Sequence, residues 1–267
     1  MNYLEIVSFD NESIKMFGPH SFVGKGAEGR IYKYNNEEII KIYYGFVTKM
    51  IDRKSCIPSE LDEFGSRELS RILSDLILRS SCVKLTKLPT KIAIFDRYTI
   101  GGISPYFDGY TPLYKLYFSL PTKDVLTIFR KVLSAVKELN ENFIYPTDLN
   151  GANILVSKSG DVELIDINSF CTYTSESADK YYGFESFYNI LNEIIDYVFL
   201  KVPEDVSYDD AMMRLHLPIE FITYLSSNLR ANYKGVLEVI EEISRNKKLM
   251  NTPVRRRVKE NGSSQIK

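Results

Sequence analysis

The sequence predicts an α+β fold in which a β-rich first part is followed by a helical second part. Two patterns carry this prediction: up to about residue 103 apolar residues alternate in short runs between turn residues, and beyond it they recur every three or four residues. The chain has 267 residues, 44% of them hydrophobic, which is enough to bury a sizeable core. The division that we expect is a β-rich part over 1–103, a connector over 104–110, a helical part over 111–250 and a flexible basic tail over 251–267.

A glycine-rich hairpin is expected early in the β-rich part. Gly24, Gly26 and Gly29 form the pattern G-x-G-x-x-G, and the alternating residues that follow predict a strand that turns at Asn35 and Asn36. Because these glycines lack side chains, backbone N–H groups can come close to phosphate oxygens. A dinucleotide-binding fold needs such glycines to open a helix, so a hairpin excludes that fold and leaves a plain structural turn as the alternative.

The other expected elements follow from periodicity. In the first part they are strands over 38–43, 91–96 and 98–106 and an amphipathic helix over 66–77. In the second part they are helices over 122–140, 187–199 and 236–243 and a hairpin of strands over 154–156 and 162–165. The tail has few apolar residues and three consecutive arginines, which predicts a solvated segment.

Composition and charge exclude several classes of function. The 34 basic and 35 acidic residues nearly cancel, so no overall charge favours nucleic acid or a membrane surface. The three cysteines lie far apart without a CxxC pair and only two histidines are present, which argues against a disulfide framework, a zinc site and a histidine-based triad. The sequence shows no secretory leader and no uninterrupted apolar span, so we expect a cytoplasmic protein whose chemistry uses carboxylates, amides and lysines.

Lys41 is a candidate for chemistry on the expected strand over 38–43. It lies between isoleucines, next to the glycine hairpin, and a lysine that points inward from such a strand needs an anionic partner. A nucleotide phosphate or a carboxylate on the following helix would supply one. Glu68 is the best candidate for that carboxylate, with Glu60 and Glu63 as alternatives. A lysine that faces outward from the sheet remains the other interpretation.

The most informative stretch runs over residues 145–156. Asp148 and Asn153 are five positions apart, an apolar strand follows them, and Asp166 lies one hairpin further on. In this arrangement the chain resembles the protein-kinase-like superfamily, whose catalytic loop has the pattern H-x-D-x-x-x-x-N and whose next strand carries a metal-binding Asp. The glycine hairpin and the strand lysine precede them in the matching order, so the resemblance covers roughly residues 22–199.

The resemblance implies a two-lobed fold, with a small β-rich lobe and a helical lobe, that binds ATP between the lobes and uses Mg²⁺ in phosphoryl transfer. It implies that Asp148 orients or deprotonates the acceptor hydroxyl, that Lys41 holds the α- and β-phosphates, and that Glu68 directs Lys41. Asn153 and Asp166 are the implied metal ligands, because Mg²⁺ prefers oxygen donors. The residues expected to contact ATP are Gly24, Gly26, Gly29, Ile31 and Lys41, together with hinge backbone groups at Ser104 and Tyr106.

The chain departs from typical protein kinases at several positions. Pro146 and Thr147 stand where His and Arg are usual, and Asn150 stands where Lys is usual. Asn168 replaces the glycine after the metal-binding Asp, and no Ala-Pro-Glu element is evident. The pattern resembles an atypical kinase, such as a small bacterial or phage-like one, and is also similar to kinases of the aminoglycoside phosphotransferase type.

The sequence leaves the acceptor and the regulation open. A hydroxyl on a protein is the expected acceptor, a small molecule is the alternative, and a nucleotide-binding pseudokinase that acts as an interaction module is a third interpretation. Thr147 has no charge with which to bind a phosphate on the segment 169–185, so phosphorylation of hydroxyls there, such as Thr172, is expected to change activity little. Lys180 is the nearest basic residue that could replace the arginine.

Overall fold

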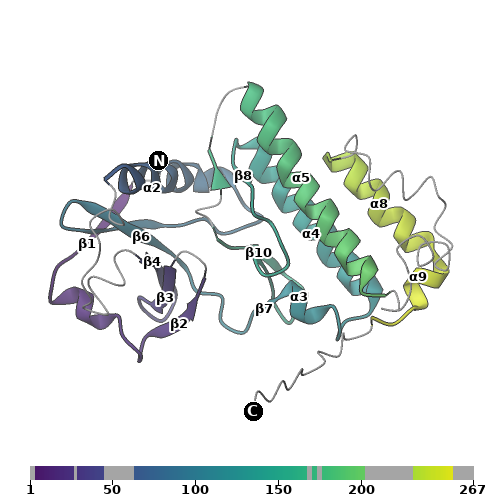
Figure 1. Cartoon of the computed structure of the whole chain (residues 1–267), viewed down its shortest axis with the longest axis horizontal. Coiled ribbons are helices and arrows are strands. Elements are labelled where there is room, and N and C mark those ends of the chain that lie inside the picture. Colours follow the sequence, from purple (N-terminus) through teal and green to yellow (C-terminus); the bar gives the residue numbers. More distant parts are fainter. Residues whose placement is uncertain are drawn as a thin grey trace, which may run out of the picture.

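The computed structural model describes residues 4–26, 29–44, 63–166, 170–172, 176–201 and 231–254. A sheet region comes first along the chain and a helical region follows it; Figure 1 shows the sheet and α2 at one end and the long helices at the other. The expected α+β class, with strands first and helices later, is therefore confirmed. Among the described helices none is both long and apolar enough to cross a membrane.

The sheet region contains a six-stranded sheet with the order β1-β5-β6-β4-β3-β2. The strands are β1 (Glu5–Phe9), β2 (Phe22–Lys25), β3 (Gly29–Lys33), β4 (Glu38–Tyr43), β5 (Lys91–Phe95) and β6 (Tyr98–Pro105). All neighbours are antiparallel except β1 and β5, which pair in parallel. Strand β1 and the short helix η1 (Ser13–Met16) were not predicted, because the partner strand of β1 lies far along the chain and no local turn marks the pair.

Helix α2 (Glu63–Arg79) lies along the sheet, and its side chains join the core of the sheet as well as that of the helical region. Leu73 and Ile77 pack with Ile92 of the sheet, whereas Leu76 belongs to the core of the helical region. The Ser66 hydroxyl accepts a hydrogen bond of 2.8 Å from the backbone N–H of Thr99. The predicted helix is thus confirmed, and its apolar stripe is wide enough to serve two cores.

The helical region is built around α4 (Thr122–Glu141), which lies alongside α5 (Glu176–Phe199) (Figure 1). Its further helices in the described part are α3 (Leu113–Leu116), α8 (Tyr233–Arg245) and α9 (Lys247–Asn251), and η4 (Ser80–Cys82) follows α2. Its short strands are β7 (Thr111–Pro112), β8 (Tyr145–Pro146), β9 (Ile154–Val156), β10 (Val162–Leu164) and β11 (Phe170–Cys171). The predicted β9–β10 hairpin is confirmed, and its turn uses Gly160 at a φ of 81°.

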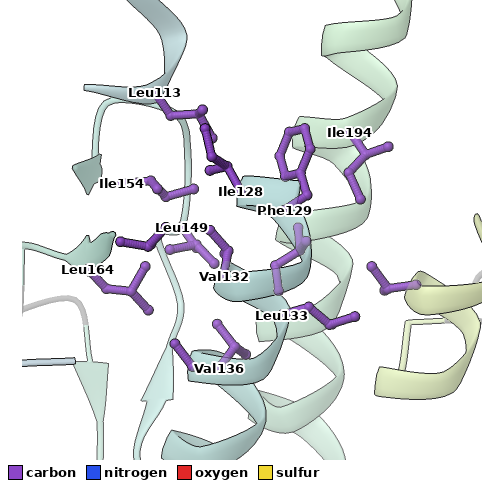
Figure 2. Packing of buried hydrophobic residues seen from close by; sticks show 14 of the residues in the cluster. Leu113, Ile128, Phe129, Val132, Leu133, Val136, Leu149, Ile154, Leu164 and Ile194 are labelled. Atoms are coloured by element: carbon purple, nitrogen blue, oxygen red, sulfur yellow. The ribbon is translucent and has the colours of Figure 1, made fainter. Parts of the chain in front are cut away.

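Figure 2 shows how the core of this region is packed. The labelled side chains of α4 are Ile128, Phe129, Val132, Leu133 and Val136, and they lie between Ile194 of α5 and the strand residues Ile154 and Leu164. Leu149, in the loop after β8, joins the same cluster and is 4% exposed. Each such side chain contributes about 1.5–3 kcal/mol on burial, so the loop that follows β8 rests on a large apolar base.

The linker over 83–90 connects α2 to β5 and is bound to carboxylates of the helical region. The Glu138 carboxylate accepts hydrogen bonds of 3.0 and 2.7 Å from the backbone N–H groups of Lys84 and Leu85. Glu163 of β10 accepts one of 2.8 Å from the Lys87 N–H and one of 3.2 Å from the Thr86 hydroxyl. Burial raises the pKa of Glu163 above its ordinary value of 4.5. The two regions are therefore joined by polar contacts as well as by the chain itself.

Candidate active site

The glycine pattern lies on a hairpin formed by β2 and β3. Gly24 pairs with Ile31 in antiparallel register, and the Gly26 N–H donates a hydrogen bond of 3.0 Å to the Gly29 carbonyl. A register shift between Phe22 and Gly24 marks a bulge in this pair. The hairpin prediction is confirmed, and because no helix opens at these glycines the dinucleotide-binding alternative is excluded.

The three glycines of the pattern have different surroundings. A Cβ atom added to Gly24 or Gly26 would meet no described atom within 4 Å. At Gly29 it would lie 2.4 Å from the carbonyl oxygen of Ile42 on β4. Gly29 is therefore required for close packing of the strands, whereas Gly24 and Gly26 leave their backbone open to approach.

Lys41 lies on β4 between Ile31 of β3 and Gly102 of β6. Its side chain is 16% exposed, and its ammonium group forms an ion pair and hydrogen bond with the carboxylate of Asp166. The ammonium group also lies 5.7 Å from the centre of the Tyr43 ring. Lys41 therefore has the anionic partner that an inward-facing lysine needs, and this partner is an acid from the helical region.

Glu68 does not make the expected contact with Lys41 among the described contacts. Its carboxylate accepts hydrogen bonds from the Arg71 guanidinium, at 3.1 and 3.0 Å from Nε and 2.6 Å from Nη2. Hydrogen bonding to Arg71 lowers the pKa of Glu68 below its ordinary value of 4.5. In this structure Glu68 pairs with Arg71 because residues three apart on a helix share a face and a guanidinium fork matches a carboxylate. The alternative Glu60 and the side chain of Glu63 lie outside the described residues.

Arg71 also connects α2 to the segment after Asp166. Its guanidinium donates to Asp75, at 3.1 Å, and to the hydroxyl of Thr172, at 3.3 Å. The Thr172 hydroxyl in turn donates a hydrogen bond of 2.8 Å to Asp75, and Thr172 is 4% exposed. Arg71 thus reaches this segment from α2, while the side chain of Lys180, the nearest basic residue in sequence, lies outside the described residues. Glu68, Arg71 and Asp75 lie at positions i, i+3 and i+7 of one helix, a spacing that predicts ion pairs along its surface.

The loop after β8 holds Asp148 with two amide side chains. Nδ2 of Asn153 donates to the Asp148 carbonyl at 2.8 Å and to its carboxylate at 3.3 Å, and Nδ2 of Asn150 donates to the carboxylate at 3.1 Å. Asp148 is exposed, while its neighbour Leu149 is buried in the core. The loop thus presents a carboxylate at the surface on a fixed backbone.

Asp166 follows the β9–β10 hairpin and lies next to this loop. The Ile165 N–H donates a hydrogen bond of 2.9 Å to the Asn153 carbonyl, which brings the two expected metal ligands side by side. Asp166 has a φ of 67°, in the left-handed region that few residues other than glycine adopt, although Asp tolerates it better than most. Its side chain is 28% exposed and reaches Lys41. Lys41, Asn153 and Asp166 are therefore brought together.

Ser104 and Tyr106 lie at the end of β6 and at the start of the connector. Ser104 pairs with Ile39 of β4, and the backbone N–H of Tyr106 donates a hydrogen bond of 2.7 Å to the Glu37 carbonyl. The Tyr106 ring lies 4.9 Å from the Lys33 ammonium group. The Tyr106 N–H is thus already used within the sheet, so a contact of this residue's backbone with a base would have to involve its carbonyl.

The chain was also compared with known proteins. No family model matches it. Over 65 residues it is 37% identical to the serine/threonine-protein kinase US3 homolog of varicella-zoster virus (strain Dumas), a match that covers 24% of this chain and 16% of that protein. Over 60 residues it is 40% identical to the US3 homolog of cercopithecine herpesvirus 9 (strain DHV), a match that covers 22% of this chain and 17% of that protein. The chain spans about a sixth of the length of these curated relatives. The local similarity supports a protein-kinase-like relationship.

A kinase-like site does not require an all-protein metal cage. In the part of the chain that the structure describes, no three His, Cys, Asp or Glu side chains are gathered as metal ligands. Mg²⁺ is usually held by one or two protein oxygens together with substrate phosphates and water, so a pair such as Asn153 and Asp166 suits it.

Two residues of α5 that sequence reasoning missed also lie against the Asp148 loop. Asn189 of α5 donates a hydrogen bond of 2.7 Å to the Thr147 carbonyl. Glu193 of α5 accepts a hydrogen bond from the hydroxyl of Tyr117 and lies against Gly151, where an added Cβ atom would be 2.4 Å from its Oε1. No motif marks these residues, because they meet the loop from a helix about 40 positions further along the chain.

Proposed function

We propose that this chain is a two-lobed, Mg-ATP-dependent phosphotransferase of the protein-kinase-like type, which transfers the γ-phosphoryl group of ATP to a hydroxyl on a protein. The observation that carries this proposal is the meeting of Lys41 from the sheet with Asp166 and Asn153 from the helical region. The local similarity to two proteins named serine/threonine-protein kinases supports a protein acceptor.

The sheet region would hold the nucleotide. Open space at Gly24 and Gly26 would let backbone groups approach the phosphates, and Lys41 would supply a positive charge to them. Ile31, which pairs with both Gly24 and Lys41, would offer an apolar contact to the base. Ser104 and Tyr106 would contribute hinge backbone groups, with Tyr106 acting through its carbonyl.

Asn153 and Asp166 would hold Mg²⁺. Nδ2 of Asn153 is engaged by Asp148, so Oδ1 is the side-chain atom left for a cation, and Asp166 contributes a partly exposed carboxylate. When bound with ATP, Mg²⁺ would neutralise charge on the phosphate oxygens. Lys41, which pairs with Asp166 here, would then bind the phosphates instead.

Asp148 would act on the acceptor hydroxyl. Its carboxylate is exposed and its direction is held by Asn150 and Asn153, which suits a group that orients a hydroxyl or accepts its proton. A positioned base of this kind is typically worth roughly 10²–10⁴ in rate. Glu68 has the least support among the proposed residues, because it would have to leave Arg71 to reach Lys41.

Mg-ATP binding and turnover test the proposal. At about 100 times its dissociation constant a ligand adds roughly 2.7 kcal/mol to the folded state, so Mg-ATP should raise the melting temperature and EDTA should remove most of the gain. Asp166→Asn and Lys41→Met should abolish ADP release while the protein stays folded. Asp124→Asn, an exposed carboxylate in the first turn of α4, is the matched control and should behave as wild type.

Two results would contradict this assignment. The absence of both binding heat and a thermal shift at millimolar Mg-ATP would exclude the nucleotide site. Normal turnover by Asp166→Asn or Lys41→Met would exclude the roles proposed for these residues. A panel of proteins, metabolites and aminoglycosides assayed for ADP release would identify the acceptor class, and binding without turnover on any of them would favour a pseudokinase.

A further inference from the structure

Three exposed aromatic side chains lie on the first half of α5. Tyr181, Phe184 and Tyr188 are 68%, 39% and 36% exposed, and their spacing of three and four positions places them on one face of the helix. The rings of Phe184 and Tyr188 are stacked, with centroids 5.8 Å apart and an angle of 11° between their planes. The Tyr181 ring meets the Tyr182 ring edge-on, with centroids 5.1 Å apart. We call Tyr181, Phe184 and Tyr188 the aromatic face of α5.

The side of α5 next to the aromatic face contacts the Asp148 loop. Asn189 donates a hydrogen bond of 2.7 Å to the carbonyl of Thr147, and the Tyr182 ring lies 6.2 Å from the Tyr145 ring of β8. Each of these two α5 residues directly follows a member of the aromatic face, and successive residues are about 100° apart around a helix. The aromatic face therefore adjoins the surface at which the Asp148 carboxylate is exposed.

Another exposed aromatic residue lies at the other end of this loop. Tyr114 of α3 is 44% exposed, and its backbone N–H donates a hydrogen bond of 3.1 Å to the carbonyl of Gly151. Asp148 is thus on a loop with exposed aromatic residues at both ends. A segment that brings a hydroxyl to Asp148 therefore approaches a surface that can contact apolar side chains.

An exposed group of aromatic rings favours a binding role over a plain solvated helix surface. Aromatic side chains are enriched at protein interfaces, and exposed apolar patches mark interaction sites. Helix α5 begins at Glu176, ten positions after Asp166, so the aromatic face follows the proposed metal ligand closely along the chain. It is connected to the candidate active site both in sequence and through the contact of Asn189 with Thr147.

We propose that the aromatic face of α5 binds the acceptor protein, by contacting an aliphatic or aromatic side chain a few residues away from the hydroxyl that is phosphorylated. This inference rests on the proposed function and adds a substrate class to it. Two stacked, uncharged rings form a flat surface that is stabilised when apolar groups cover it, whereas the negative face of a ring repels a carboxylate. Contacts of this kind discriminate between acceptors by affinity, because they lie beside the reacting group and not on it.

Peptide binding to the full-length chain tests this inference without turnover. The probe is a short labelled peptide with a central serine and leucines at alternating flanking positions, and its counterparts carry alanine, lysine or glutamate in place of leucine. Fluorescence anisotropy should show the leucine peptide binding at least about tenfold more tightly than each counterpart. Phe184→Ala and Tyr188→Ala should bring the affinity for the leucine peptide to within about threefold of that for the alanine peptide.

Steady-state kinetics with Mg-ATP provide a second measurement. Phe184→Ala should raise KM for the leucine peptide at least about tenfold and change KM for the alanine peptide by less than about threefold. Phe143→Asn is the matched control, because Phe143 is a 43% exposed aromatic residue ahead of β8 whose φ of 57° is also tolerated by Asn. This control should behave as wild type in both measurements.

The outcomes separate this proposal from the proposed function. Equal binding of the leucine and alanine peptides would overturn the docking surface, and so would a preference for lysine or glutamate. A concentration-dependent dimer that Phe184→Ala disperses would also overturn it, because a second copy of the chain would then cover the aromatic face. Selective binding of the leucine peptide without phosphorylation of any peptide would support the docking surface and contradict the proposed function.

A second variant covers the case in which Phe184→Ala does not fold. Tyr181→Ala removes the most exposed ring of the aromatic face and should weaken binding of the leucine peptide at least about threefold. Wild-type affinity of Tyr181→Ala for this peptide would then overturn the proposal.

Discussion

The sheet region and the helical region hold their proposed site residues in different ways. The glycine hairpin is held by strand pairing and leaves open space at Gly24 and Gly26. The Asp148 loop is held by hydrogen bonds from its own amides and from α5. The loop is therefore ordered by contacts within the helical region, whereas the backbone of the hairpin is open to approach at these two glycines.

The two regions also differ in where they place charge. In the sheet region Lys91 pairs with Glu38 at 2.9 Å, and both side chains keep 16–19% exposure. In the helical region Lys201 is 2% exposed and its ammonium group has neutral partners: the Thr122 hydroxyl and, at 2.8 and 3.1 Å, the carbonyls of Leu249 and Thr252. Burial lowers the pKa of Lys201 from its ordinary 10.5 to about 8. The hydrogen bonds from Lys201 therefore hold the end of α9, but burying its ammonium group without a negatively charged partner costs desolvation energy.

The largest predicted effect concerns this buried charge. The folded pKa of Lys201 is below the unfolded one, so between pH 8 and 10.5 the unfolded chain binds more protons and the free energy of unfolding rises with pH. Relative to Lys201→Met, the free energy of unfolding of the wild type should increase by about 3 kcal/mol as the pH rises from 8 to 10.5. The same amount is lost again when the pH is lowered to 8. Urea denaturation of both proteins from about pH 7 to pH 10 measures the difference. Lys247→Met is the exposed control, and a pH-independent difference would contradict the lowered pKa.

A second prediction compares two glycines of the hairpin. Gly29→Ala should lower the free energy of unfolding by about 1–3 kcal/mol, because the new Cβ would overlap backbone of β4. Gly26→Ala should change it by less than about 0.5 kcal/mol, since no described atom is near, but should weaken Mg-ATP binding. Denaturation and calorimetry on both variants measure these effects. Equal destabilisation by the two substitutions would show that the hairpin is not open at Gly26.

The smallest predicted effect lies where the two regions meet. Thr172→Val keeps the volume of the side chain but removes a hydroxyl that bridges Asp75 and Arg71. The expected loss is about 1 kcal/mol of unfolding free energy, which is the net value of a typical hydrogen bond. Thr127→Val, an exposed threonine on α4, is the control in the same denaturation experiment. A loss above about 3 kcal/mol would mean that this contact, rather than the two cores, holds the regions together.

Most elements of the fold were predictable from local pattern. The helix over 122–140 was expected from an apolar repeat and is α4, and β4 has the predicted bounds of 38–43. The order of Gly24, Lys41, Asp148 and Asp166 along the chain predicts kinase-like chemistry from the sequence alone. These features are encoded within short windows, because the periodicity of side chains and the chemistry of turns depend on near neighbours.

The choice of partners was decided only by the tertiary structure. Glu68 was expected to meet Lys41, but Arg71 is closer along its own helix and Asp166 reaches the lysine from the other region. Glu193 and Lys201 belong to no sequence motif, and their partners, Tyr117 and the end of α9, are brought to them by packing. A charged side chain bonds to whichever group packing brings within about 3 Å, and distances between segments far apart in sequence are set by the packing of the whole chain.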